Sequence, residues 1–140
     1  MSITITKAQE NLSYQLPAES ILQLADYQRP PAVTIDSKKE YMLLSYRDTY
    51  KSLNDLNQQE ISLAGLRVNP ITNISSSTNY ITNLKIRKVS DNEAIQVKGL
   101  PAQPRITYLT WSPDETKVAF TNTTTEGVEL WTVDLVTAQA

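Results

Sequence analysis

The 140-residue chain is long enough for one domain with a moderate hydrophobic core. Hydrophobic residues make up 40% and charged residues 20%, a balance typical of a folded protein. The net charge of −2 gives no electrostatic reason to expect nucleic acid or an anionic membrane as a partner. Without histidine or cysteine, the chain cannot hold a complete Ser-His-Asp site, a thiolate nucleophile or a cysteine-ligated metal. We therefore expect no catalytic, metal-binding or cofactor-binding residue, and no enzyme activity from this chain alone.

The N-terminal part carries one helical pattern and no targeting or membrane signal. A short helix is expected over 17–25, and the prolines in "YQRPP" end it. No apolar run reaches the roughly 18 residues that a membrane-spanning helix needs. "MSITITKAQE" lacks the basic flank and apolar core of an intact signal peptide, so an exported product would have a leader removed or upstream.

From Ala32 the pattern predicts short strands. Strands are expected at 32–36 and 41–47, followed by a polar excursion at about 48–79 in which "EISLAGLRV" docks on the rest of the protein. Further strands are expected at 80–89 and 94–99. The connection "SDNE" (90–93) has the oxygen ligands of a calcium loop, but four residues do not supply six to eight ordered ligands, so a hairpin turn is favoured.

The last third predicts three more strands, at 105–111, 117–123 and 127–134. Pro113 suits the second position of the turn in "SPDET", where Asp114 accepts backbone N–H bonds. Gly127 is expected to supply conformational freedom at the next hairpin.

An internal repeat connects the two halves. "VTIDSKKEYMLL" (33–44) aligns without a gap on "LTWSPDETKVAF" (109–120), which places Ile35 on Trp111 and Leu44 on Phe120. The offset, 111 − 35 = 76 residues, equals one propeller blade of about 40–45 residues plus an insertion of roughly 30. The polar excursion has about that length.

The predicted fold is therefore mainly β: a partial β-propeller of about two blades, made of antiparallel four-stranded sheets. Residues 1–30 would form an N-terminal segment with a short helix, and 31–100 a first blade with a long insertion at about 48–79. Residues 101–140 would form a second blade that stops before its fourth strand, which suggests a truncated chain.

The segment "ITYLTWSPDETKVAFTNTTTEGVELWTVDL" resembles the TolB-like propeller repeat, in which "W-S-P-D-G" precedes a strand and "L-W-V-D" follows it. Glu115 stands where glycine is usual, and Thr132 separates Trp131 from Val133. The first copy keeps the pattern without Ser-Pro-Asp. The residues of this structural repeat motif are Trp111, Ser112, Pro113, Asp114, Trp131 and Asp134.

A narrower resemblance comes from "YQRPP", "ISLAGLRVNPITN" and "GLPAQPRITYLTWSPD" in this order. Together they are similar to the N-terminal propeller region of prolyl oligopeptidase-family serine peptidases, especially the glutamyl endopeptidase-like branch. The resemblance implies a parent whose C-terminal α/β-hydrolase domain carries the catalytic serine, acid and histidine. No catalytic residue transfers to this chain. A bacterial parent would suggest a periplasmic or secreted location, which composition leaves open.

Several residues allow a functional and a structural interpretation. Trp111 and Trp131 could form an aromatic ligand platform, but packing between blades is favoured because both lie in repeat strands. Asp114 and Asp134 are expected to bond local backbone rather than to act as an acid–base pair. Arg67 could reach a substrate carboxylate or the hydrolase domain, whereas a structural ion pair is the simpler role. N-glycosylation patterns occur at three positions: Asn11, Asn73 and Asn122.

Two function classes follow. In the first, the chain is a non-catalytic propeller fragment that gates peptide access to the hydrolase domain of a serine peptidase. In the second, it belongs to a TolB-like propeller of a non-enzymatic binding protein. In either case uncovered blades and unpaired strand edges predict self-association of the isolated chain.

Overall fold

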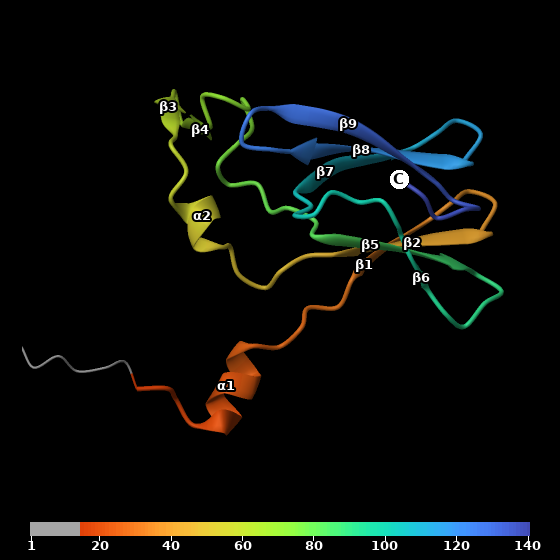
Figure 1. Ribbon diagram of the computed structural model, residues 1–140, viewed down its shortest axis with the longest axis horizontal. Helices are drawn as coiled ribbons and strands as arrows, with labels where there is room; N and C mark the ends of the chain where they lie inside the picture. The colour runs from red at the N-terminus through yellow and green to blue at the C-terminus, as the bar shows by residue number, and fades with distance from the viewer. Residues whose placement is uncertain (1–14) are drawn as a thin grey trace, which may run out of the picture.

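The computed structural model describes residues 15–140, so Asn11 and the first part of the N-terminal segment, 1–14, lie outside the described residues. The described chain is mainly β and its sheets are antiparallel. Two sheets stack on each other and a small hairpin projects beside them (Figure 1). The elements in chain order are α1 (Glu19–Ala25), β1 (Ala32–Ile35), β2 (Tyr41–Tyr46), α2 (Leu53–Leu56), β3 (Ile61–Leu63), β4 (Leu66–Val68), β5 (Asn83–Lys88), β6 (Ile95–Gln96), β7 (Ile106–Trp111), β8 (Lys117–Thr123) and β9 (Val128–Asp134).

The first sheet has the order β1-β2-β5-β6. Its strands follow one another as antiparallel neighbours, and the insertion leaves the sheet after β2 and returns at β5. Residues 89–94 connect β5 to β6, which confirms the predicted hairpin, although its connection is longer than the four residues 90–93. The observed strands are shorter than predicted at 80–89 and 94–99, because pairing covers only Asn83–Lys88 and Ile95–Gln96.

The second sheet has the order β7-β8-β9, as predicted for the last third of the chain. β8 pairs with β9 over all seven residues, from Lys117↔Asp134 to Thr123↔Val128. The register of β7 on β8 slips between Thr107 and Thr110, where Tyr108 has a φ of 53°. The expectation for Gly127 is wrong: its φ is not positive, and the Thr124 N–H closes the turn by donating to the Gly127 carbonyl at 2.8 Å.

The insertion contains one short helix and one hairpin. Ser52 caps α2, since its Oγ accepts from the Asp55 backbone N–H while the Asp55 carboxylate accepts from the Ser52 backbone N–H. Ala64 (φ 46°) and Gly65 (φ 92°) form the tight turn between β3 and β4. The expected docking of this hairpin is wrong, because its residues are exposed except for half-buried Val68.

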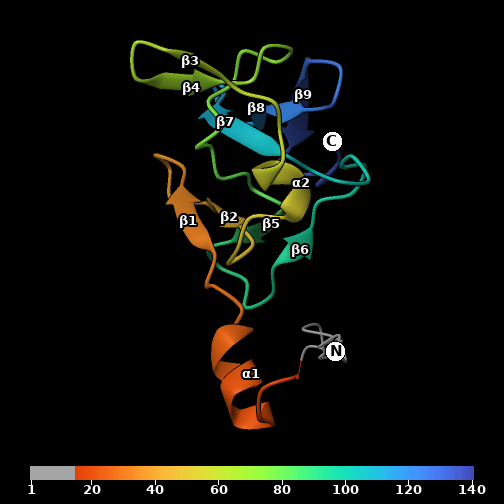
Figure 2. The same cartoon turned by 90° about the vertical axis from the view of Figure 1, so that its left-hand side faces the viewer.

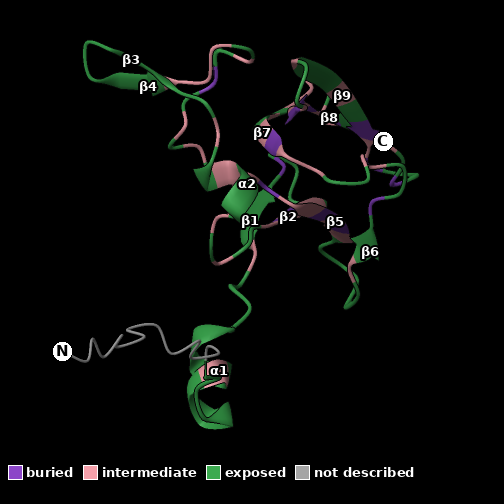
Figure 3. Ribbon diagram, turned by 60° about the vertical axis from the view of Figure 1, so that its left-hand side comes forward, coloured by how far each residue is buried: buried purple, intermediate pink, exposed green. Residues whose placement is uncertain are grey.

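The hydrophobic core lies between the two large sheets, where Figure 3 shows most of the buried strand residues. Three of its largest side chains, Leu84, Ile106 and Phe120, are 0% exposed. Isolated bridges join the sheets beside this core: Ile81 pairs with Ile106, and Lys98 pairs with Gln139. The other buried apolar residues of this cluster are Leu43, Ile81, Ile86, Val97, Val118, Val133, Leu135 and Ala138.

The 76-residue repeat predicted from the sequence exists in the strand register. Ile35 pairs with Met42 in the first sheet, and Trp111 pairs with Val118 in the second, each 76 positions later. The two turns also match: Lys39 donates its N–H to the Asp36 carbonyl, and Glu115 donates to the Ser112 carbonyl. Lys39 and Glu115 have φ values of 59° and 58°. Glu115 thus occupies a left-handed position, which explains why glycine is usual there.

The two sheets turn opposite faces toward the shared core. Side chains alternate between the two faces of a strand, so buried Leu43 and half-buried Met42 lie on opposite faces of β2. In the second sheet Val118 is buried, and it is the repeat equivalent of Met42 rather than of Leu43. The sheets therefore stack head to tail. Within residues 15–140 the sheets do not close into a ring, so the propeller remains a prediction.

Helix α1 stands apart from both sheets (Figures 1 and 2). None of its residues is buried, and Ile21 and Leu24 are exposed. The predicted helix begins two residues later than expected, at Glu19. None of the helices in the described part of the chain has the length and apolar character required to cross a membrane.

Candidate functional site

The two repeat turns contact each other and form a polar joint between the sheets. The Ser37 N–H and Oγ donate to the two carboxylate oxygens of Glu115 at 2.9 and 2.7 Å. The Lys38 ammonium donates to the Asp114 carbonyl at 3.2 Å. Because each partner comes from an equivalent turn, this joint fixes how one repeat sits on the next.

Hydrogen bonds to the turn carboxylates favour their ionised forms. The Ser112 hydroxyl, followed by the hydroxyl and N–H of Thr116, lowers the pKa of Asp114 to about 2. The two Ser37 bonds lower the pKa of Glu115. Ser112 also accepts the Lys117 N–H at 3.0 Å. The Ser-Pro-Asp turn is thus held by its own side chains, which is a structural role.

Trp111 and Trp131 are both half-buried and pack against the core from the second sheet. The Trp131 ring stacks on Phe120, with centroids 6.4 Å apart and an angle of 11° between the planes. Its Nε1–H donates to the Glu129 carboxylate at 2.9 Å. One face of the Trp131 ring is thus covered by Phe120. Trp131 also lines a cavity between the insertion and the second sheet.

Asp134 and Arg67 also have local partners. Asp134 Oδ1 accepts from the backbone N–H groups of Val136 and Thr137, and these bonds lower its pKa. Arg67, in the exposed β3–β4 hairpin, pairs with Glu60 at 3.1 Å while 68% of its side chain is exposed. The structural alternative for Arg67 is therefore present, and the structure places no cavity beside it among the described cavities.

The glycosylation patterns differ in accessibility. Asn73 is exposed in the insertion with a φ of 56°. Asn122 is only 3% exposed, since its side chain donates to Glu129 and accepts the Arg105 N–H. A glycan on Asn122 would require the second sheet to open.

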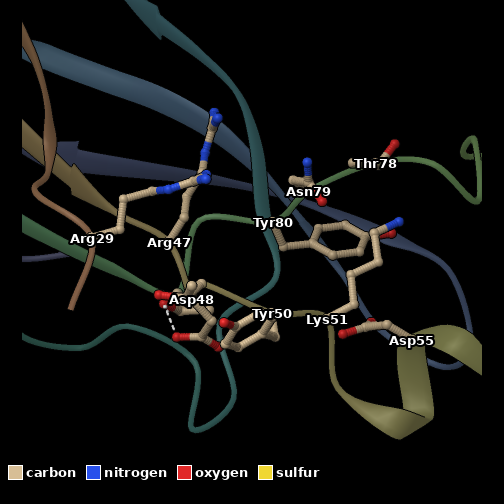
Figure 4. Close-up of a pocket in the computed structure, with 11 residues that line it drawn as sticks. Arg29, Arg47, Asp48, Tyr50, Lys51, Asp55, Thr78, Asn79 and Tyr80 are labelled. Atoms are coloured by element: carbon tan, nitrogen blue, oxygen red, sulfur yellow. Dashed lines mark hydrogen bonds between the residues drawn. The ribbon is translucent and has the colours of Figure 1, made fainter. Parts of the chain in front are cut away.

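A basic cleft opens where the insertion leaves and rejoins the first sheet (Figure 4). Its cavity has a volume of about 170 Å³ and continues into a second cavity of about 610 Å³ that shares Arg29, Arg47 and Asp48. Figure 4 shows Arg29 and Arg47 at one end and Lys51 and Asp55 at the other. Asp48 accepts from the Thr82 hydroxyl at 3.2 Å. Guanidinium groups in such a cleft can bind a carboxylate in two-point fashion.

The fold brings Arg29 and Arg47 to this cleft because they flank the open end of the β1–β2 hairpin. Ala32 pairs with Ser45, and the Thr49 hydroxyl donates to the Tyr27 carbonyl at 2.9 Å. Sequence reasoning missed both arginines, since neither lies in a repeat or motif. No sequence signal marks them, because only the pairing of β1 with β2 places positions 29 and 47 in one cavity.

Arg105 separates this cleft from a larger cavity between the insertion and the second sheet. Its guanidinium lies 2.7 Å from Asp55 in helix α2 and 4.3 Å from the centre of the Tyr80 ring. The ion pair is largely shielded, with 26% and 22% of the two side chains exposed. Arg105 therefore attaches α2 to the second sheet and forms a wall of the larger cavity.

The groups that line the cleft can bind a ligand through charge and hydrogen bonds. The sequence contains no imidazole or thiol that could activate a nucleophile. The cleft instead offers cations and hydrogen-bond donors on a rigid sheet.

Comparison with known proteins shows distant similarity to two plant proteins. The probable glutamyl endopeptidase, chloroplastic, of Oryza sativa subsp. japonica is 27% identical over 139 residues, covering 92% of this chain and 15% of the rice protein. The protein of the same name from Arabidopsis thaliana is 26% identical over 136 residues, covering 91% of this chain and 14% of that protein. This chain thus spans about one seventh of the length of these relatives. Neither a protein-family model nor a solved structure matches it.

Proposed function

We propose that this chain is a propeller segment of a serine peptidase of the prolyl oligopeptidase family, close to its glutamyl endopeptidase branch. In this proposal the catalytic groups lie outside this chain. Its sheets would belong to a propeller that controls which peptides reach an α/β-hydrolase domain located elsewhere in the complete protein.

The observation that carries this proposal is the repeat in three dimensions. Two meander sheets share their register at an offset of 76 residues and stack head to tail around one core. Propeller blades have these properties, because each blade packs on the next with the same pair of faces. The distant similarity to two peptidases covers 91–92% of the chain, so it includes both sheets and the insertion.

If the chain acts in this way, the basic cleft is a better candidate than Arg67 for binding the peptide substrate. The relatives are named as glutamyl endopeptidases, which implies peptide substrates that carry glutamate carboxylates. Among the described residues, Arg29 and Arg47 form no salt bridge and line a shared cavity, whereas Arg67 is already paired with Glu60. We propose that Arg29 and Arg47 attract acidic peptides toward the hydrolase domain.

The first test is the reading frame downstream of the Ala140 codon in the native locus. The proposal expects further blades followed by a hydrolase domain with a G-x-S-x-G turn. A frame with further repeats and no hydrolase domain would instead favour a TolB-like binding module. The Trp-Ser-Pro-Asp turn, in which the Ser112 and Thr116 hydroxyls donate to Asp114, is the observation that supports this second function.

The second test uses the complete protein. A double variant R29A/R47A should raise KM for a glutamate-containing peptide by at least about tenfold, with little change for a neutral peptide, since one charge-assisted bond contributes about 1.5–3 kcal/mol. R67A is the matched control, because it removes one arginine of the insertion outside the cleft. Equal effects of both variants would argue against the role of the cleft.

A further inference from the structure

The larger cavity that Arg105 borders has a volume of about 690 Å³ and lies between the insertion and the second sheet. Its chemistry differs from that of the basic cleft. Its volume is within the range of small-molecule sites. Residues of the insertion form one wall, and β8, β9 and the turn that joins them form the opposite wall. The lining is dominated by amide side chains: Asn54, Gln58, Gln59, Asn69, Gln103 and Asn122.

The cavity lining carries one charged residue of each sign. Arg105 and Glu129 are its two charged lining residues, and Arg105 also pairs with Asp55 behind the wall. Four threonines add hydroxyl groups to the six amides. Amides and hydroxyls both donate and accept hydrogen bonds, so such a surface suits an uncharged ligand whose groups also do both.

Glu129 is prepared as an acceptor. One of its oxygens, Oε2, receives the Trp131 Nε1–H at 2.9 Å and the Asn122 amide at 3.1 Å. These two donors hold the carboxylate in place and lower its pKa. The other oxygen receives no hydrogen bond from the described residues, which leaves it able to accept from a ligand hydroxyl.

Two further features favour a ligand over solvent alone. Trp131 lines the cavity beside this carboxylate and offers an apolar surface next to polar groups. Thr123, also in the lining, is 4% exposed, and its hydroxyl has no hydrogen-bond partner in the described structure. Buried polar groups are normally paired; because this hydroxyl is shielded from solvent, a ligand would reach it only after the Thr123 side chain turns toward the cavity.

We propose that this cavity binds a neutral oligosaccharide. Sugar hydroxyls both donate and accept, which matches the amide and threonine walls, and the apolar face of a sugar ring matches Trp131. Two neighbouring hydroxyls would donate to the free oxygen of Glu129. An anionic ligand would meet the Glu129 carboxylate, and a cationic ligand would meet the Arg105 guanidinium. This inference does not depend on the peptidase role of the chain.

The test uses the 140-residue chain labelled with ¹⁵N, at a concentration at which light scattering shows a monomer, and three linear probes: maltohexaose, cellohexaose and chitohexaose. The chain has two tryptophans, so its indole N–H signals give an internal comparison. At millimolar probe, at least one sugar should shift the Trp131 indole signal in a saturable way and leave that of Trp111 unchanged. The variant Glu129→Gln should weaken this binding about tenfold, because a bond to a charged acceptor is replaced by a bond to a neutral one.

The control variant is Glu126→Gln, which removes the same charge from a residue of the β8–β9 turn that does not line the cavity. It should bind as the unmodified chain does. The proposal is overturned if none of the three sugars shifts the Trp131 signal, or if Glu129→Gln binds as tightly as Glu126→Gln. It is also overturned if an uncharged Gly-Ser-Asn-Gln peptide produces the shift and the sugars do not, since the site would then recognise polypeptide.

Discussion

Replacing Lys39 by glycine should stabilise the protein. Lys39 has a φ of 59°, in the left-handed region that costs a residue with a side chain roughly 1–2 kcal/mol. Glycine avoids this cost but loses about 0.5–1 kcal/mol through its greater freedom in the unfolded chain. The balance is a gain of about 0.5–1 kcal/mol, or roughly 2–3 °C in Tm for a domain of this size.

The repeat supplies a matched variant, Glu115→Gly, at the equivalent position with a φ of 58°. This substitution relieves the same backbone strain but removes both hydrogen bonds that Ser37 donates to Glu115. Lys39→Gly should therefore be more stable than Glu115→Gly in urea denaturation monitored by circular dichroism. Equal stabilities would show that the joint between the turns contributes nothing. A Lys39→Gly variant that is less stable than the original chain would refute the strain argument.

Four other predictions follow from the structure. Phe120→Ala should lower the free energy of unfolding by about 3–5 kcal/mol, because it empties a fully buried core position; urea denaturation measures this. The pKa of Asp114 is about 2 when folded, below its ordinary 3.8, so its stabilising effect is complete above pH 4 and is lost as pH falls toward 2. The stability difference between the original chain and Asp114→Asn should accordingly shrink over this interval. Asp55→Asn should cost about 1–2 kcal/mol by breaking the shielded pair with Arg105, and limited proteolysis should then cut first within 48–79. The isolated chain should form concentration-dependent oligomers in light scattering, whereas a monodisperse monomer with a cooperative melt would contradict the exposed-face argument.

Local patterns predicted the sheets well. Alternating side chains and the turns around Pro113 located every strand of the two large sheets, and the 76-residue alignment matched the observed pairing of Ile35 and Trp111 with their partners. These features depend on contacts between residues close in sequence, which periodicity and turn chemistry record. The strand ends were less accurate, because strand pairing at the sheet edges ends before the apolar pattern does.

The sites could not be predicted from local patterns. The cavity near Trp131 combines residues from α2, the segment around Asn69 and the turn after β8, which are far apart in the sequence. Sequence reasoning weighed an aromatic ligand platform at Trp131 and favoured packing. Its stacking on Phe120 agrees with that, but nothing in the sequence indicated that its indole N–H would hold Glu129 beside a cavity. At the β3–β4 hairpin the sequence predicted a contact that the structure lacks. The apolar residues of "EISLAGLRV" suggested that this segment docks on the rest of the protein, but the hairpin is exposed.

The opposite faces that the two sheets present to their core have a consequence for assembly. In the repeat, the face that each sheet leaves exposed corresponds to the face that the other sheet buries. A further unit added to either exposed face would therefore repeat the contact that already joins the sheet of Met42 to the sheet of Val118. Such head-to-tail contacts contain no element that stops growth; only curvature closes them into a ring, and a small error in angle produces an open fibre. Surface substitutions that make one exposed face more apolar should thus promote filaments rather than dimers.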